Sequence, residues 1–450
     1  MIAPRAGEAG PSAGRRHSLS SAALTVGVMT VLVGLATLLR EQLVARYFGA
    51  GDAVDAFVMA STLPLFLITV VATSLASAHV PVAMALRSRE GTRAGAELSG
   101  TVLLLLIAAL IVCAVLLWLA APAYLGWVAT GFDAGKRRLA EHLLSLLLPM
   151  LVLGGVSGFL TAELNAAGRF AIPALAPALV PVLAGAGVYG LHSGLGIDAL
   201  AYATDAGYAF QCLALAWLLL RGRGAALSGL GRHREEIAQV AGHYLPLLGG
   251  AALMATTPLL DQTMASWLAP GSVAQLSFGS VLTMFASGFG ARVLGGPALS
   301  VFSALAARAE WTRLNAEFGR TMRLAILVSL PVSAVLALLS GPIVALVFGG
   351  GAFTVATAIE VAKVQQMLCL QIPWYVSSIL AVRLLTALGM NRQVFVVAAA
   401  NVLLNALLNF LLMRWLGVAG IALATALVYG LACAACWWLA SRRLEQLCGT

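Results

Sequence analysis

Long apolar runs, separated by short polar stretches, fill almost the whole sequence. The runs cover residues 21–39, 53–85, 99–121, 140–167, 173–192, 199–220, 242–266, 273–307, 323–347, 356–386, 393–413 and 418–440. About 20 apolar residues in a helix span the hydrocarbon core of a bilayer, whereas membrane β-barrels show shorter, alternating segments. The pattern therefore predicts an all-α polytopic membrane protein with about 12 transmembrane helices.

Basic residues favour one side of these predicted helices. With the N-terminus inside, 18 Lys and Arg residues fall in inner loops and tails, and six fall outside. The outer six are Arg40, Arg46, Lys136, Arg137, Arg138 and Arg414. Because short loops rich in Lys and Arg stay in the cytoplasm, we expect both termini to be cytoplasmic, in a bacterial inner membrane.

The composition agrees with a membrane protein that carries no catalytic centre. Hydrophobic residues make up 61% of the chain and charged residues 10%, with a net charge of +9. The basic excess suits cytoplasmic loops and lipid headgroups rather than nucleic acid. The six cysteines lack the spacing of a metal site or a disulfide framework, and no P-loop or HExxH motif is present. We expect a protein that is not an enzyme and has no cofactor or metal centre.

The chain divides near its midpoint, where residues 221–239 form the longest polar stretch. Residues 260–278 faintly repeat residues 40–58, since Gln42 and Gln262 are 220 positions apart, as are Gly51 and Gly271. Six helices between equivalent positions give both halves the same orientation, a plan found in transporters.

This division predicts two pseudo-symmetric six-helix lobes around a central cavity. The predicted parts are a disordered cytoplasmic tail (1–20), an N-terminal lobe (21–220), a cytoplasmic connector (221–241), a C-terminal lobe (242–441) and a second cytoplasmic tail (442–450).

Several charged residues fall inside the predicted helices, where a charge is costly unless it faces protein or water. The candidate diphosphate- and saccharide-binding cations are Arg40, Arg292, Arg383 and Lys363; arginine suits phosphate because it makes paired hydrogen bonds. The candidate supporting or ion-coupling residues are Asp55, Asp261, Gln262 and Glu163. These residues permit transport to be coupled to Na+ or H+, and the membrane potential is an alternative energy source for transport. Glu360 and Lys363 can instead pair as a structural contact.

Turn chemistry gathers between the first two predicted helices, where Arg46, Tyr47, Phe48, Gly49 and Gly51 form a candidate outer gate and hinge. Glycine allows a sharp turn there. The alternative is a tight interfacial turn with aromatic anchors. Short cytoplasmic turns contain Asn165, Arg169 and Arg392. Asn401, Asn405 and Asn409 recur every four residues and form either helix–helix contacts or a sugar-binding wall.

Four stretches of the sequence resemble the MurJ/MviN family of lipid II flippases. They are RxxLVARYFGAGDAVDAF (40–57), LNAAGRFAIPALAPALVPV (164–182), ASWLAPGSVAQLSF (265–278) and LPVSAVLALLSGPIVALVFGGGAFT (330–354). The resemblance implies the fold of the multidrug/oligosaccharidyl-lipid/polysaccharide exporter superfamily, with two six-helix lobes around a V-shaped cavity. The family carries two further C-terminal spans that form a lipid-tail groove, which we expect to be absent from a 12-span chain.

The resemblance also places the family's cavity residues. One cavity arginine falls on Arg40 and the conserved-motif aspartate on Asp55, whereas three further arginine positions fall on Gly34, Ile68 and Val281. Arg292 is the nearest substitute. We expect Arg40, with Arg292 or Arg383, to hold a diphosphate, and Asp55 to orient Arg40.

The resulting hypothesis is a flippase that moves a polyprenyl-diphosphate-linked saccharide, lipid II or a related lipid-linked glycan, by alternating access for peptidoglycan or surface-polysaccharide synthesis. The expected partners are this lipid-linked oligosaccharide, membrane lipids and glycan-synthesis or polymerisation proteins. The alternatives are an exopolysaccharide repeat-unit flippase, an ion-coupled small-molecule exporter on the same fold, and a scaffold that does not transport.

Overall fold

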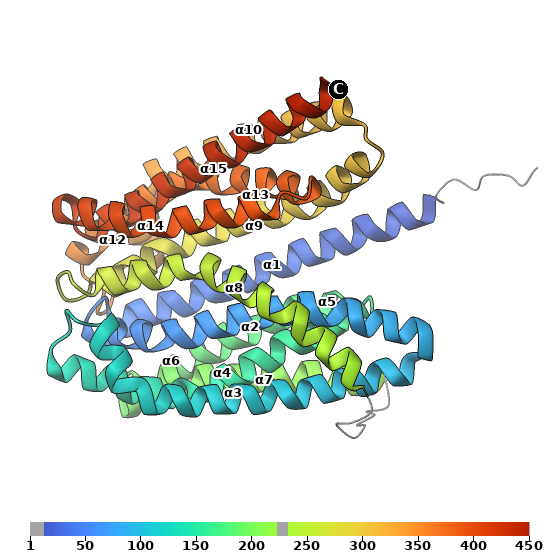
Figure 1. Ribbon diagram of the computed structural model, residues 1–450. Coiled ribbons are helices and arrows are strands. Elements are labelled where there is room, and N and C mark those ends of the chain that lie inside the picture. Colours follow the sequence, from blue (N-terminus) through green and yellow to red (C-terminus); the bar gives the residue numbers. More distant parts are fainter. Residues whose placement is uncertain (1–12, 223–232, 450) are drawn as a thin grey trace, which may run out of the picture.

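A computed structural model describes residues 13–222 and 233–449, with the side chains of residues 27–221, 233–291, 294, 295 and 297–449. The described chain is helical throughout (Figure 1). The helices are α1 (Ala13–Phe48), α2 (Asp52–Glu90), α3 (Thr92–Val128), α4 (Ala134–Ala166), α5 (Ala171–Leu175), the 3-10 helix η1 (Ala176–Ala178), α6 (Leu179–Leu195), α7 (Asp198–Gly222), α8 (Arg234–Ala265), α9 (Ser272–Ala307), α10 (Trp311–Leu338), α11 (Ser340–Phe348), α12 (Val355–Cys369), α13 (Gln371–Ala387), α14 (Asn391–Leu416) and α15 (Val418–Cys448).

These helices supply 12 candidate membrane spans within the described residues, which confirms the predicted number. Two of these spans are built from consecutive helices: Ala171–Leu195 from α5, η1 and α6, and Val355–Ala387 from α12 and α13. The short helix α11 follows the α10 span after a break at Leu339. Prolines near these breaks lack the N–H that an uninterrupted helix would use, so the helix restarts there.

The helices form two six-helix lobes, α1–α7 and α8–α15. Equivalent helices pack in equivalent pairs: α6 lies on α7 as α14 lies on α15, and α1 lies on α6 as α8 lies on α14. In Figure 1 the lobes meet at the left and diverge toward the right, with α1 running between them. We call the left side the closed end and the right side the open end. Helix α1 begins at the open end, where the C-terminus also lies.

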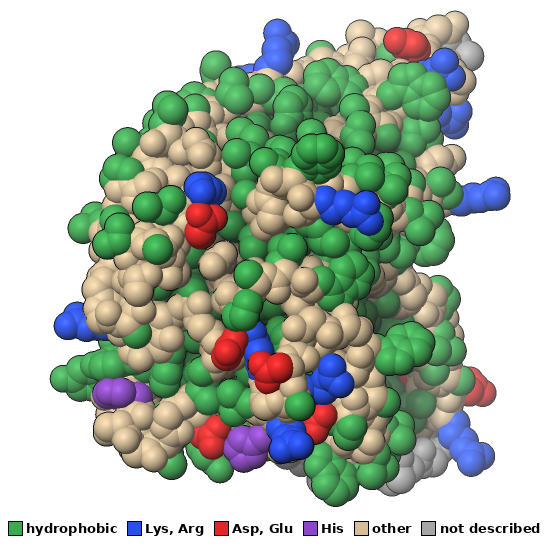
Figure 2. Space-filling view, turned by 90° about the vertical axis from the view of Figure 1, so that its left-hand side faces the viewer, with side chains coloured by type: hydrophobic (Ala, Val, Ile, Leu, Met, Phe, Trp, Pro, Cys, Tyr) green, Lys and Arg blue, Asp and Glu red, His purple; other side chains and the backbone are tan. Residues whose placement is uncertain are grey.

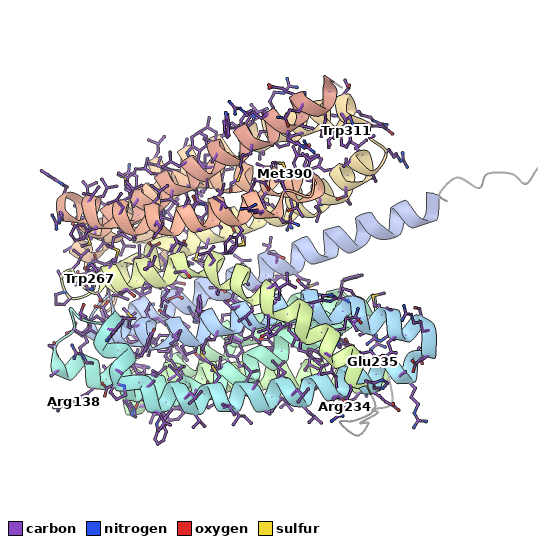
Figure 3. The ribbon with its side chains drawn as sticks, in the orientation of Figure 1. Arg138, Arg234, Glu235, Trp267, Trp311 and Met390 are labelled. Carbon is purple, nitrogen blue, oxygen red and sulfur yellow. The ribbon has the colours of Figure 1, made fainter. Side chains whose placement is uncertain are left out.

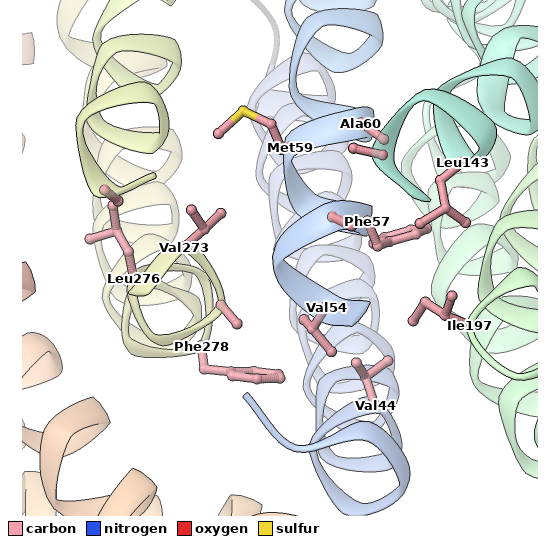
Figure 4. Close-up of a cluster of buried hydrophobic side chains, with 14 of the residues drawn as sticks. Val44, Val54, Phe57, Met59, Ala60, Leu143, Ile197, Val273, Leu276 and Phe278 are labelled. Carbon is pink, nitrogen blue, oxygen red and sulfur yellow. The ribbon is translucent and has the colours of Figure 1, made fainter. Parts of the chain in front are cut away.

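The largest buried hydrophobic cluster joins both lobes at the closed end. It brings Val44, Val54 and Phe57 together with Val273 and Phe278 (Figure 4). The other clusters are arranged differently: one lies wholly among α9, α10, α13 and α15, and two lie among α2–α7 and the start of α8. The lobes therefore share a hydrophobic core at the closed end and keep separate cores elsewhere.

Helix α8 contacts both lobes. Near its start, Val240 is buried in the cluster formed by α2, α3 and α4, and His233 lies 3.6 Å from Glu97 of α3. At its other end, Asp261 bonds to α14 and α15. The helix begins at Arg234, so the last eight residues of the predicted connector 221–241 are helical. Acidic Glu235 and Glu236 in the first turn favour this start.

The predicted disorder of residues 1–20 is wrong for residues 13–20, which begin α1. Residues 1–12 lie outside the described part of the chain. At the C-terminus, α15 continues to Cys448 through most of the predicted tail. In both places a helix extends past the apolar run, because Arg and Ser residues are compatible with a helix that projects beyond the bilayer.

Candidate functional site

Asp55 joins the two lobes at the closed end. Its side chain is buried (1% exposed) near the start of α2. The backbone N–H groups of Gly271 and Ala274, at the start of α9, donate to its two carboxylate oxygens, each over 2.7 Å. A carboxylate fits there because the first N–H groups of a helix have no partner within the helix. Asp55 thus caps a helix of the opposite lobe.

Lys136 completes this contact from α4. Its buried ammonium group donates to Asp55 and lies 2.8 Å from Asp52, which is about half exposed. The first turn of α4 is fixed by Asp133, whose side chain accepts from the backbone N–H groups of Gly135 and Lys136. These two hydrogen bonds lower the pKa of Asp133 and keep it ionised. The turn that carries Lys136 is therefore well defined.

Backbone contacts bring the lobes close around this ion pair. Ser266 Oγ donates to the carbonyl oxygen of Val128 over 3.0 Å, and Ala352 N–H donates to the carbonyl oxygen of Arg46 over 2.8 Å. A Cβ on Gly131 would overlap the Ser266 carbonyl oxygen. Figure 2 looks onto this end and shows acidic and basic side chains side by side among apolar ones. Close packing at glycine and hydrogen bonds hold the two lobes together at this end, because in lipid no hydrophobic force drives helices together.

The predicted gate residues lie at this closed end, but they contribute unequally. Gly49 has φ +63° and approaches Ala352, so both its conformation and its contact favour glycine. Gly51 has φ −117°, which any residue adopts, so this conformation does not itself require glycine, and its hinge role stays a prediction. Tyr47 stacks on His192 of its own lobe with ring centroids 3.9 Å apart. Phe48 packs against the shared core.

Arg40 lines a cavity of about 420 Å³ within the N-terminal lobe. The wall also contains Tyr208, Gln211 and Ile68, with threonines from α1, α2 and α4. The Arg40 side chain is 23% exposed and pairs with the adjacent Glu41, while its Nε is buried without a hydrogen-bond partner. The prediction that Asp55 orients Arg40 is wrong, because Asp55 is used at the closed end and Glu41 is the partner.

The structure does not gather the other predicted cations around Arg40. Arg383 lies on α13 in the opposite lobe, and its Nε is buried without a hydrogen-bond partner. Lys363 is about half exposed and pairs with Glu360 over 2.8 Å, as the structural alternative predicts. Arg292 belongs to α9, but its side chain is outside the described residues.

The three positions without an arginine lie in different surroundings. Ile68 lies in the wall of the same cavity as Arg40. Its side chain fills the space that a Cβ on Gly154 would occupy. Gly34 on α1 faces the ring of Phe285 on α9. Val281 is half-buried on α9. The N-terminal cavity therefore combines one cation with an otherwise uncharged wall.

A second polar site lies inside the C-terminal lobe around Asp261. Its carboxylate is buried and accepts from Asn409 Nδ2 over 2.7 Å and from Thr425 Oγ1 over 3.0 Å. Asn409 Nδ2 also donates to Asn405 Oδ1 over 3.3 Å. The adjacent Gln262 has a buried Oε1 without a hydrogen-bond partner. Among the described residues, no Lys, Arg or His neutralises Asp261.

These oxygen donors fit a hard monovalent cation. The buried Asn409 Oδ1 has no hydrogen-bond partner among the described residues, while Nδ2 of the same amide group faces the Asp261 carboxylate. Asn409, which also bonds to Asn405, thus joins α14 to α8. This is the helix–helix contact that the sequence offers as one interpretation of the repeated asparagines. No group of three or more His, Cys, Asp or Glu residues that could hold a metal ion occurs among the described residues.

Glu163 belongs to a different buried cluster, in the N-terminal lobe. It accepts from Arg87 Nη2 and lies 3.0 Å from His79 Nε2, and Ser99 contacts both of these partners. The cluster ties α2, α3 and α4 together near the open end. Its geometry supports a structural role rather than the predicted supporting or ion-coupling role.

Glu163→Gln is expected to destabilise the N-terminal lobe by about 3–5 kcal/mol, because Arg87 loses the carboxylate with which it forms a buried pair. Thermal unfolding in detergent measures this effect. Glu360→Gln is the matched control, since its pair with Lys363 is more than half exposed and exposed pairs contribute at most about 1 kcal/mol. Equal losses for the two variants would contradict the structural role.

The predicted cytoplasmic turns lie at the open end. Arg169 Nη1 donates to the carbonyl oxygen of Leu218 over 2.8 Å, near the end of α7. Asn165 closes the turn through its carbonyl oxygen, which accepts from Gly168. Arg392 lies in the first turn of α14. Figure 3 shows the two ends, with Arg138 and Trp267 at the closed end and Arg234 and Trp311 toward the open end.

Comparison with known proteins decides the family. The family model described as "Lipid II flippase MurJ" matches residues 44–449. This chain belongs to the MurJ family of lipid II flippases. The family consists of transporters, so the predicted flippase family and the non-enzymatic class are confirmed.

Individual relatives agree with this assignment. A probable lipid II flippase MurJ from Synechocystis sp. is 29% identical over 459 residues, which cover 97% of this chain and 84% of the relative. A MurJ structure in an inward closed conformation superposes with a TM-score of 0.81 at 18% identity, over 94% of this chain and 90% of that chain.

The fold is shared more widely. An inward-facing multidrug-resistance MATE transporter of the MOP superfamily gives a TM-score of 0.80 at 15% identity, over 95% of this chain and 99% of that chain. At this identity the likeness shows the fold alone. The predicted superfamily fold with two six-helix lobes is confirmed.

Three residues of the closed end and the cavity are not predicted from the sequence. Lys136, one of only two lysines in the chain, is predicted only as an outer-loop charge. Tyr208 and Gln211 of α7 line the cavity but have no distinguishing sequence pattern. The only available signal was that Asp52, Asp55 and Lys136 are predicted at the same side of the membrane.

Proposed function

We propose that this chain moves lipid II from the inner to the outer leaflet of the cytoplasmic membrane for peptidoglycan synthesis. Membership of the MurJ family over residues 44–449 carries the proposal. The structure supports it with two lobes that share a core at one end only, since such an arrangement can rock about that contact. The Arg40 cavity offers a cation for the diphosphate of the lipid.

We infer that the closed end faces the periplasm. The open end carries most of the loop arginines, including Arg87, Arg169 and Arg442, whereas the closed end carries Arg46, Lys136, Arg137, Arg138 and Arg414. Arginine-rich loops favour the cytoplasm. In this orientation the described state is open inward, both termini are cytoplasmic, and the lipid headgroup enters from the side on which it is made.

In the proposed cycle, the diphosphate approaches Arg40 from the cytoplasmic side. The guanidinium then exchanges part of its contact with Glu41 for charge-assisted hydrogen bonds to phosphate. Tyr208, Gln211 and the threonine hydroxyls of the cavity wall offer further donors and acceptors for saccharide groups. Transport then requires release of the Asp55 contacts with Gly271 and Ala274 of the opposite lobe, which opens the periplasmic side.

We propose that the Asp261 site binds a coupling cation, for which its oxygen donors fit Na+. A bound cation would neutralise the buried carboxylate and be held by Asn409 and Thr425. Asp261 lies at the end of α8, and α8 also packs on α2 of the other lobe. Cation binding at this site can therefore change the relative orientation of the two lobes. Glycan-synthesis proteins remain proposed partners on the basis of the proposed pathway step alone.

Purified protein in proteoliposomes tests the cargo. Fluorescent lipid II is placed in one leaflet, and its arrival in the other is measured against protein-free vesicles and against a lipid-linked exopolysaccharide unit. Lipid II movement that depends on the protein supports the proposal. Movement of the exopolysaccharide unit alone, by protein that is monodisperse and folded, would overturn lipid II as the cargo.

A further inference from the structure

Glu41 is a buried carboxylate beside the cation of the N-terminal cavity. It is 6% exposed, and its carboxylate accepts from Nη2 of the neighbouring Arg40. Adjacent residues of a helix point about 100° apart and do not face each other. The pair therefore forms only because the long Arg40 side chain bends sideways toward Glu41 instead of extending straight from α1.

This ion pair has less support than the buried pairs formed by Asp55 and Glu163. Asp55 accepts from an ammonium group and from two backbone N–H groups, and Glu163 contacts a guanidinium and an imidazole. Among the described residues, by contrast, Arg40 is the sole side chain that hydrogen bonds to Glu41, and its Nε is buried without a partner. A buried ion pair is well stabilised only when further hydrogen bonds satisfy its remaining groups. A competing anion can therefore break the Arg40–Glu41 pair more readily than the other two.

Packing fixes the base of the Arg40 side chain, so the guanidinium is the part that can move. Gly185 of α6 lies close against α1 at this point, since a Cβ on it would be 3.6 Å from the Cα of Arg40. The other described side chains in the cavity wall are uncharged. While Glu41 holds the guanidinium, the site is electrically neutral, and when Glu41 is displaced, the site presents one cation to a ligand.

We propose that Glu41 is an internal competitor for Arg40, which gives up the guanidinium when the diphosphate of the cargo binds and takes it back when the cargo leaves. While the diphosphate is bound, the buried carboxylate lacks its cation, which is costly. This cost lowers the affinity for the cargo and favours its release on the far side of the membrane. Glu41 acts through Arg40 and is a positioning residue. The role rests on the proposed function, because that function assigns Arg40 to the diphosphate.

A competitor differs from a residue that only holds Arg40 in place. A holding residue increases the affinity for the cargo, so its loss weakens binding. A competitor decreases that affinity, so its loss strengthens binding, and cargo that is bound more tightly leaves more slowly. Tighter binding of the cargo does not by itself speed the cycle. The sign of the change in affinity therefore separates the two roles.

Glu41→Gln tests this sign. We expect the purified variant to bind a polyprenyl diphosphate in detergent at least about tenfold more tightly than the wild type, since a hydrogen bond to a charged group contributes that factor or more. In proteoliposomes, lipid II movement at saturating lipid II is expected to fall by up to the same factor. Glu360→Gln is the matched control, because its pair with Lys363 is more than half exposed and lies in the other lobe. We expect it to change neither quantity.

Two further variants separate the charge of Glu41 from its contribution to the fold. Glu41→Asp keeps the negative charge and is expected to retain the wild-type affinity and rate. Arg40→Ala/Glu41→Gln removes the cation as well and is expected to bind the polyprenyl diphosphate more weakly than the wild type. Glu41→Gln thus strengthens binding only while Arg40 is present. A polyprenol without phosphate is the ligand control, and all of these proteins are expected to bind it equally.

The outcomes distinguish the role of Glu41 from the proposed function. Folded wild-type protein that neither binds the polyprenyl diphosphate nor moves lipid II would overturn both. Binding and movement by the wild type, with unchanged or weaker binding by monodisperse Glu41→Gln protein, would overturn the competitor role alone. Glu41→Asp protein that binds at least about tenfold more tightly than the wild type would also overturn it, because the negative charge would then not be what competes.

Discussion

Asp55→Ala is expected to shift the protein strongly away from the conformation in which the two lobes meet at the closed end. The change removes the acceptor from the backbone N–H groups of Gly271 and Ala274 in the opposite lobe, whereas Lys136 belongs to the same lobe as Asp55. A hydrogen bond to a charged group contributes about 1.5–3 kcal/mol, so the loss of two costs about 3 kcal/mol or more, and each 1.4 kcal/mol is about a factor of ten. The closed population should therefore fall at least about 100-fold relative to the open one.

Distance measurements between spin labels at Arg138 and Trp267 report this shift, because both side chains are exposed at the closed end and belong to opposite lobes. Asp52→Ala is the matched control, since Asp52 contacts the same ammonium group but is about half exposed. Its effect should stay below about 1 kcal/mol. An Asp55→Ala protein with the wild-type distance distribution would show that this contact does not hold the lobes together.

Arg40→Ala/Glu41→Gln is expected to reduce lipid II movement by about 10- to 100-fold while the protein stays folded. A hydrogen bond to a charged group contributes about 1.5–3 kcal/mol, and among the described residues Arg40 is the only cation in the wall of the N-terminal cavity. The added Glu41→Gln removes the unpaired carboxylate, so any loss reports on the cargo rather than on stability.

Fluorescent lipid II movement in proteoliposomes measures this loss. Arg414→Ala is the control, because Arg414 stacks on Phe410 with 4.0 Å to the ring centroid and lies far from the cavity, at the end of α14. We expect it to move lipid II at the wild-type rate. Undiminished transport by the Arg40→Ala/Glu41→Gln protein would place the diphosphate elsewhere.

The pattern of apolar runs in the sequence is sufficient to predict the membrane spans, because every helix that crosses a bilayer needs about 20 apolar residues. It was insufficient at helix ends. Residues 234–241 are polar and were interpreted as a connector, yet α8 begins at Arg234. A helix can extend beyond the membrane at little cost, so polarity alone does not mark its end.

Local sequence also predicted Asp55 and Asp261 as buried charges but misassigned the partner of Asp55. Asp55 bonds to Lys136, 81 positions away, and to Gly271 and Ala274, more than 200 positions away. The first pairing depends on how α2 packs on α4 within one lobe, and the second on how the two lobes pack together, neither of which is encoded locally in the sequence. The Asp261 site was closer to prediction because Asn405 and Asn409 follow helical spacing on one face.

A reversible disulfide across the closed end tests alternating access most directly. In a background free of the six native cysteines, Arg46→Cys and Ala352→Cys place two thiols where the backbones of the two lobes are joined by a hydrogen bond. Lipid II movement is measured after oxidation and again after reduction, with each single cysteine as control. We predict that oxidation stops transport and that reduction restores it. Fully cross-linked protein that moves lipid II at the wild-type rate would contradict a cycle that opens this end.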